Sequence, residues 1–86
     1  MSIVVNTQLG ERVDVTQLKD GDEVHYLGHS DKTPFKAIIE TGLVKGDNIY
    51  NEGVFVYGDD WKQYVSMWFI VKVCRNGETI YEKDVS

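Results

Sequence analysis

Turn-forming residues recur along this chain at intervals too short for long helices. Glycine, asparagine and aspartate mark the breaks, which fall at residues 10, 20–22, 28, 42, 46–48, 53, 58–60 and 76–77. The segments between them are rich in valine, isoleucine, tyrosine and phenylalanine, which favour strands. The pattern predicts an all-β fold, either a small barrel or a strongly bent antiparallel sheet of about five or six strands.

Six segments have the composition of strands: residues 3–5, 23–27, 35–41, 54–57, 64–74 and 79–83. Within residues 64–74, every second residue is apolar, and we expect this face to form part of the core. It comprises Val65, Met67, Phe69, Val71 and Val73. The segment is longer than a typical strand, as in small barrels where one strand bends across both halves of the sheet.

Asn76 and Gly77 predict a two-residue type I′ hairpin turn, because this turn requires positive φ at both central positions. The resulting register pairs Arg75 with Glu78, Cys74 with Thr79 and Val73 with Ile80. Continued unchanged, it would place Glu82 on the apolar face. Two alternatives follow: the last strand leaves the sheet early, or a bulge shifts its register.

Residues 15–19 form the one predicted helical turn, with Asp14 or Thr16 as its N-cap and Leu18 packed inward. The glycines of residues 42–46 suggest a turn and not a phosphate loop, because no Gly-Lys-Ser/Thr ending and no helix follow them.

The chain has 86 residues and a formal net charge of -5, with 42% hydrophobic and 27% charged residues. A chain this short buries about 60% of its unfolded surface, so we expect residues 1–86 to form a single domain around one core. The acidic balance disfavours direct binding to nucleic acid, whose phosphates require a basic face.

Cys74 is the only cysteine, so an internal disulfide is impossible. The first residues lack a signal-peptide pattern, and no apolar run reaches the roughly 18 residues of a membrane span. These features predict a protein of the reduced cytoplasm that does not bind membranes.

Histidine and cysteine offer little for a metal site, because tetrahedral zinc would have to draw on one thiolate and two histidines. His25 and His29 lie about 13 Å apart if the chain between them is a strand, which is too far for two ligands of one ion. We therefore expect no metal and no cofactor.

Catalytic signatures are also lacking. Cys74 has the character of a small packed residue, and Ser66 has no strand-to-helix elbow around it. The acids of residues 20–23 and 59–60 lie in turns, where solvated carboxylates are common. We predict that the protein is not an enzyme and has no catalytic residue.

Six aromatic residues fall within residues 50–68, more than one small core is expected to hold. Trp61 and Tyr64 flank an acidic turn that contains Asp59 and Asp60. Such an aromatic and acidic surface suits a partner segment that carries lysine, arginine or proline. The predicted partner-binding residues are Trp61, Tyr64, Asp59, Asp60, Tyr57 and Trp68.

Residues 15–28 contain Leu18-Lys19-Asp20-Gly21-Asp22-Glu23-Val24-His25-Tyr26-Leu27-Gly28, which resembles the opening of many small SH3-like barrels. Residues 35–42 look like the strand that follows. Residues 54–64, with their Val-Phe-Val-Tyr strand and Asp-Trp-x-x-Tyr turn, are similar to small uncharacterised barrel proteins of tailed bacteriophages. The resemblance covers about half the chain and departs after Tyr64, and it implies an SH3-like barrel of phage origin in the host cytoplasm.

These features favour a non-enzymatic protein-binding module, a phage accessory or host-modulating protein whose partner has a basic surface. Two alternatives are a structural subunit of a homo-oligomer or particle, and an acidic nucleic-acid mimic that inhibits another protein.

Overall fold

The structure of the protein, a computed structural model, describes residues 3–28 and 38–83. The elements, in chain order, are β1 (Val4–Thr7), β2 (Gly10–Val13), the 3₁₀ turn η1 (Val15–Gln17), β3 (Glu23–Gly28), β4 (Ile38–Tyr50), β5 (Gly53–Tyr57), β6 (Lys62–Ser66), the 3₁₀ turn η2 (Met67–Phe69), β7 (Ile70–Arg75) and β8 (Glu78–Glu82). Among these residues β1 and β2 form a hairpin, and the other strands form an antiparallel sheet in the order β6-β5-β4-β3-β7-β8. The predicted all-β fold is confirmed.

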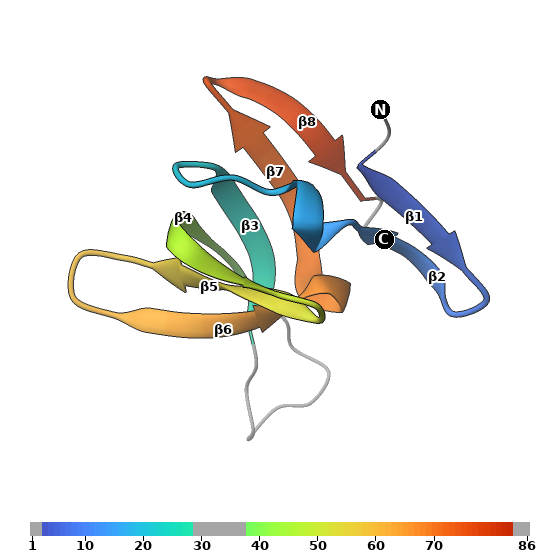
Figure 1. The fold of residues 1–86 in the computed structure, drawn as a ribbon, viewed down its shortest axis with the longest axis horizontal. Coiled ribbons are helices and arrows are strands. Elements are labelled where there is room, and N and C mark those ends of the chain that lie inside the picture. Colours follow the sequence, from blue (N-terminus) through green and yellow to red (C-terminus); the bar gives the residue numbers. More distant parts are fainter. Residues whose placement is uncertain (1–2, 29–37, 84–86) are drawn as a thin grey trace.

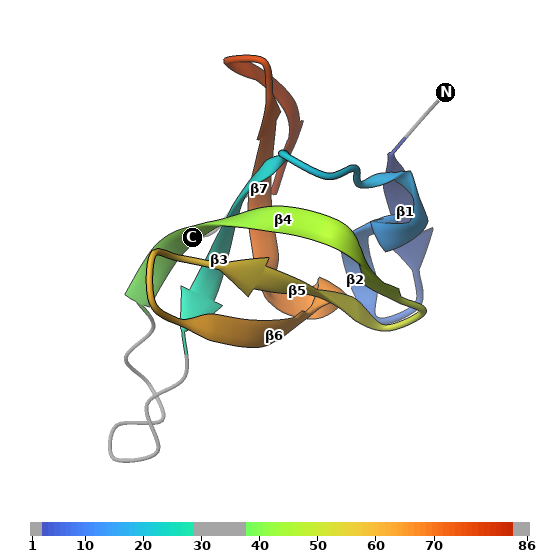
Figure 2. The same ribbon diagram turned by 60° about the vertical axis from the view of Figure 1, so that its left-hand side comes forward.

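The six-stranded sheet is sharply bent, so that β3, β7 and β8 cross the direction of β4, β5 and β6 (Figures 1 and 2). The 13-residue strand β4 belongs to both halves, because its first part pairs with β3 and its later part with β5. Its register with β5 breaks between Val44 and Ile49. There the Gly46 N–H donates to Asp20 Oδ1 over 2.7 Å, which links this part of β4 to the turn before β3.

The predicted turn over residues 42–46 is therefore wrong. Gly42 lies in β4 opposite Val24, and only the later part of the segment departs from regular pairing. The expected strand at residues 35–41 is confirmed from Ile38 onward, and its first three positions lie outside the described residues.

The core lies on the concave side of the bent sheet, where η1 and the end of β2 also pack. It consists mainly of valines, with two fully buried tyrosines and two other large apolar side chains. Its members are Val13, Val15, Leu18, Val24, Tyr26, Val44, Val54, Val56, Val65, Ile70, Val73 and Tyr81. Asp14 caps η1 by accepting the Thr16 N–H over 3.1 Å, as one of the two capping alternatives predicted.

Residues 64–74 do not form the single strand that their alternation predicts. Ser66 accepts the Trp68 N–H and begins η2, which separates β6 from β7. The register of β7 with β3 then shifts, because Lys72 pairs with His25 but Ile70 pairs with Tyr26. Ile70 and Val71 are therefore both buried, while Met67 and Phe69 are only partly buried. Val65, Val71 and Val73 are buried as predicted, whereas the two residues within η2 are not core members but pack against the core while partly buried.

The hairpin prediction at Asn76 and Gly77 is confirmed, with φ of 54° and 79°. Arg75 pairs with Glu78, as expected. The register then shifts between Val73 and Cys74, so that Val73 faces the buried Tyr81 instead of Ile80. Of the two alternatives for the last strand, the bulge is correct.

Asp22 is a buried acid, in contrast to the solvated residue expected in its turn. It is 2% exposed and receives two hydrogen bonds from Arg75, from Nε at 2.9 Å and from Nη2 at 2.8 Å. The Lys19 N–H donates a third, over 2.8 Å. Burial alone would raise the pKa of Asp22, but these hydrogen bonds and the guanidinium charge outweigh burial and lower it.

The substitution Asp22→Asn removes the charge and one acceptor from this pair. Because hydrogen bonds to charged groups contribute about 1.5–3 kcal/mol each and Arg75 can be partly rehydrated, we expect a loss of about 2–3 kcal/mol near neutral pH. The lowered pKa means that Asp22 stabilises the fold above its ordinary value of 3.8, and this contribution is lost as the pH falls through the folded-state pKa. Urea unfolding at several pH values should show the gap between the two proteins closing below pH 3.8, whereas the exposed control Asp60→Asn should follow the unmodified protein throughout. A gap of constant size would contradict this role of Asp22.

Candidate functional site

The aromatic residues singled out by the sequence gather around β6, the strand at one end of the sheet order. Side chains alternate between the two faces of a strand. Lys62 and Tyr64 project from the convex face, whereas Gln63 and the preceding Trp61 project toward the face that carries the core. The two residues expected to form one platform therefore lie on opposite faces.

Tyr64 belongs to a cluster of three rings on the convex face, which we call the tyrosine hollow. Its ring meets those of Tyr50 and Phe55 edge-to-face, with centroids 6.1 and 5.4 Å away. With Asn51 and Glu52 these rings line an open hollow of about 570 Å³. Burial, then the charge of Glu52, raises the pKa of Tyr64, so its phenol stays a neutral hydrogen-bond donor at physiological pH.

The two tyrosine rings of the tyrosine hollow are partly exposed, whereas Phe55 is half-buried. Tyr50 is 53% and Tyr64 41% exposed. The Lys62 ammonium lies 5.1 Å from the centroid of the Phe55 ring, which leaves a cation at the rim of an otherwise acidic surface.

Trp61 lines a second hollow on the other face of β6, which we call the tryptophan hollow. Its volume is about 380 Å³, and its other lining residues are Glu40 and Gln63, with Lys62, whose ammonium lies over the Phe55 ring on the convex face. The indole is 40% exposed and rests on glycine backbone, since a methyl group added to Gly58 would overlap the ring and one added to Gly42 would lie 3.1 Å from it. Because these two positions carry no side chain, the indole of Trp61 can pack directly on the backbone.

A buried phenol lies beside the tryptophan hollow. Tyr26 is fully buried and donates its hydroxyl to Gln63 Oε1 at 3.5 Å. Burial, then the hydrogen bond and charge of Glu40, raises the pKa of Tyr26. The hydroxyl therefore remains protonated, and its one hydrogen has Gln63 Oε1 and the Glu40 carboxylate as alternative acceptors at the inner side of this hollow.

Of the other predicted binding residues, Asp59, Asp60 and Tyr57 lie near β6, whereas Trp68 lies apart from it. Asp59 and Asp60 are exposed in the turn that leads into it, and the Gly58 N–H closes this turn by donating to the Trp61 carbonyl over 3.0 Å. Tyr57 is half-buried, with the Lys45 ammonium 5.5 Å from its ring. Trp68 lies apart in η2, between Arg12 at 5.9 Å and the Lys83 ammonium at 6.0 Å.

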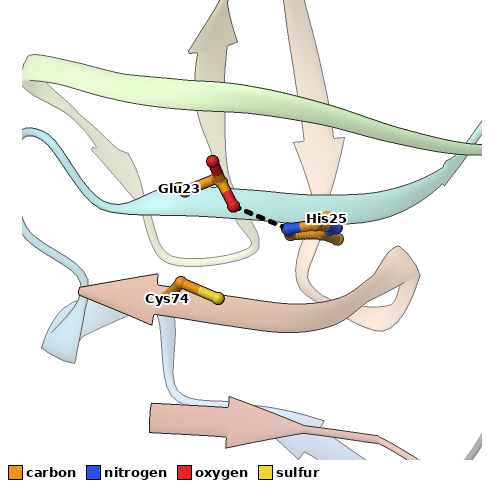
Figure 3. A group of neighbouring side chains, drawn as sticks. All are labelled: Glu23, His25 and Cys74. Carbon is orange, nitrogen blue, oxygen red and sulfur yellow. Dashed lines mark hydrogen bonds and ion pairs between the residues drawn. The ribbon is translucent and has the colours of Figure 1, made fainter. Parts of the chain in front are cut away.

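The structure brings a third group together that sequence reasoning missed. Glu23 and His25 project from the same face of β3, and Cys74 lies opposite Glu23 on β7 (Figure 3). His25 Nε2 and Glu23 Oε1 are 2.8 Å apart, and one ligand atom of each of the three residues lies within 4.8 Å of the others. The spacing of two residues between Glu23 and His25 is visible in the sequence, but their proximity to Cys74 depends on strand pairing. His29 lies outside the described residues.

No protein-family model, curated protein or solved structure matches the chain. Within residues 3–28 and 38–83, there is no helix of the length and apolarity needed to span a bilayer.

The packing of Trp61 on Gly58 can be tested with Gly58→Ala. The added methyl group overlaps the indole, and we expect a loss of about 1–3 kcal/mol, as for other overpacked sites. In a Trp61→Ala background the same change should be neutral or slightly stabilising, because alanine reduces the freedom of the unfolded chain. Chemical unfolding of the unmodified protein, the two single variants and the double variant measures this coupling. Equal effects of Gly58→Ala in both backgrounds would show that Trp61 does not pack on Gly58.

Proposed function

We propose that the protein is a binding module that takes an extended, basic segment of a partner protein as an added strand beside β6. The observation that carries this proposal is an edge strand with an aromatic hollow on each face. An added strand directs successive side chains to opposite faces of the sheet. A peptide along β6 would thus reach the tyrosine hollow with one set of side chains and the tryptophan hollow with the other.

The backbone of β6 supports such an addition. Its five residues pair with β5 from Gly53–Ser66 to Tyr57–Lys62, and no other described strand pairs with its second side. A strand at the edge of a sheet presents unpaired N–H and C=O groups that can bind another chain. The main chain would supply affinity for any extended segment, and the two hollows would select its side chains.

The carboxylates around β6 favour a basic partner. Glu52 lies near the end of β6, where the Met67 N–H donates to its carbonyl, and Asp59 and Asp60 precede the other end. Glu40 lines the tryptophan hollow. Lysine or arginine side chains can therefore combine contact with an aromatic ring and attraction to a nearby carboxylate. Lys62 opposes this preference locally at the tyrosine hollow.

The test is selection of extended peptides from a random library on the purified protein, followed by affinity measurements with the enriched sequences. We expect basic residues to be enriched, and methylation of peptide N–H groups to weaken binding at every second position, the signature of strand pairing. Trp61→Ala and Tyr64→Ala should each weaken binding more than about tenfold, since interface energy concentrates in aromatic anchors. Trp68→Ala is the matched control and should bind normally while folded by circular dichroism.

Asp59→Asn combined with Asp60→Asn should mainly slow association, and added salt should reduce the difference. Methylation effects without a period of two, or normal binding by Trp61→Ala and Tyr64→Ala, would contradict the proposal. Light scattering over a range of concentrations tests the alternative of a structural subunit. A stable oligomer that Tyr64→Ala dissociates would mean that a second copy occupies this edge.

A further inference from the structure

We propose that Glu23, His25 and Cys74 form a three-ligand zinc site on the convex face of the sheet, at the junction of β3 and β7. This site is independent of the β6 edge. The three residues supply a carboxylate oxygen, an imidazole nitrogen and a thiolate sulfur, and Zn²⁺ binds all three ligand types. Three protein ligands leave the fourth tetrahedral position for water.

The backbone already places the ligands correctly. Glu23 and His25 are two residues apart on β3 and so share a face, and Cys74 is the direct cross-strand neighbour of Glu23. Val24 and Val73, the residues between and beside them, are fully buried and anchor both strands in the core. Arg75, next to Cys74, donates two hydrogen bonds to the buried Asp22, next to Glu23.

The side chains need only a small movement to bind an ion. Zinc bonds of about 2.0–2.3 Å place two tetrahedral ligand atoms roughly 3.3–3.8 Å apart. The three ligand atoms already lie within 4.8 Å of one another. The side chains of Glu23 and His25 are 50% and 21% exposed, so the carboxylate can turn from its hydrogen bond with His25 toward an ion.

Charge at the site favours a dication. Glu23 and a Cys74 thiolate together carry two negative charges, which match Zn²⁺. Lys72 faces His25 across the strand pair and opposes binding, but it also pairs in register with Glu82, which offers its ammonium a carboxylate on the other side. The Thr79 hydroxyl lies 3.8 Å from Cys74 Sγ and can support the sulfur as a hydrogen-bond donor.

The experiment is titration of the reduced, metal-free protein with Co²⁺, a spectroscopic substitute for Zn²⁺, followed by displacement with Zn²⁺. We expect one ion per chain, a thiolate-to-cobalt charge-transfer band and the visible absorption of tetrahedral cobalt. Cys74→Ser should abolish the charge-transfer band, and His25→Ala and Glu23→Gln should each weaken Zn²⁺ binding at least tenfold. The control Glu78→Gln changes an exposed acid on β8 that is not part of the cluster, and it should bind normally.

Thermal unfolding provides a readout that does not rely on absorption. A ligand that binds only the folded state raises the unfolding temperature, so Zn²⁺ should stabilise the unmodified protein and Glu78→Gln but not Cys74→Ser. Mg²⁺, which prefers oxygen ligands, should have no effect. Absence of the charge-transfer band, a stoichiometry of one ion per two chains, or equal Zn²⁺ affinity of all variants would overturn the proposal.

Discussion

The ion pair between the buried Asp22 and the partly exposed Arg75 joins the start of β3 to the end of β7. Asp22 ends the turn before β3, and Arg75 ends β7 beside the hairpin. Arg75 also donates to the Gln17 carbonyl over 3.1 Å, so one guanidinium connects η1, the start of β3 and the end of β7. A two-pronged hydrogen bond of this kind tolerates little displacement, and it therefore fixes the register in which Glu23 faces Cys74.

The bend in β4 also determines how the surface is arranged. Because this one strand pairs with β3 and then with β5, the two halves of the sheet enclose the core between them. β6 lies at the end of the strand order on one side of the bend, while β3 and β7 lie on the other. The edge at which we propose peptide binding and the proposed zinc site consequently occupy different halves of the same sheet.

The sequence predicted local features well, because turns and caps depend on neighbouring residues. Asn76 and Gly77 form the expected turn, and Asp14 caps η1. A bulge in the last strand was one of the two alternatives that would keep Glu82 off the apolar face, and the structure has this bulge. The strand β2 was missed because Gly10–Val13 contains only one strongly β-forming residue, and it is a strand because it pairs with β1. The break at Ser66 was missed because a continuous apolar alternation concealed a serine that caps η2.

The candidate site was predicted only in part, because side chains alternate between the two faces of a strand. Trp61 and Tyr64 are three residues apart, an odd spacing that sends them to opposite faces when the chain is extended. Tyr50 and Phe55 join Tyr64 through the pairing of β4, β5 and β6, which the residues alone do not specify. The same holds for Asp22 with Arg75, whose contact spans 53 positions.

Amide hydrogen exchange along β6 tests most directly whether this strand is an open edge. In an antiparallel pair only alternate residues of an edge strand bond to the neighbouring strand, and the remaining N–H groups face outward. An open edge predicts slow exchange at every second amide of Lys62–Ser66 and fast exchange at those between. β5 pairs with β4 as well as with β6, so it should be protected at both sets of positions apart from Phe55, which has no partner on β4 at the break in register. Uniform protection of the β6 amides would show that another strand already covers this edge and would contradict its role as a binding site.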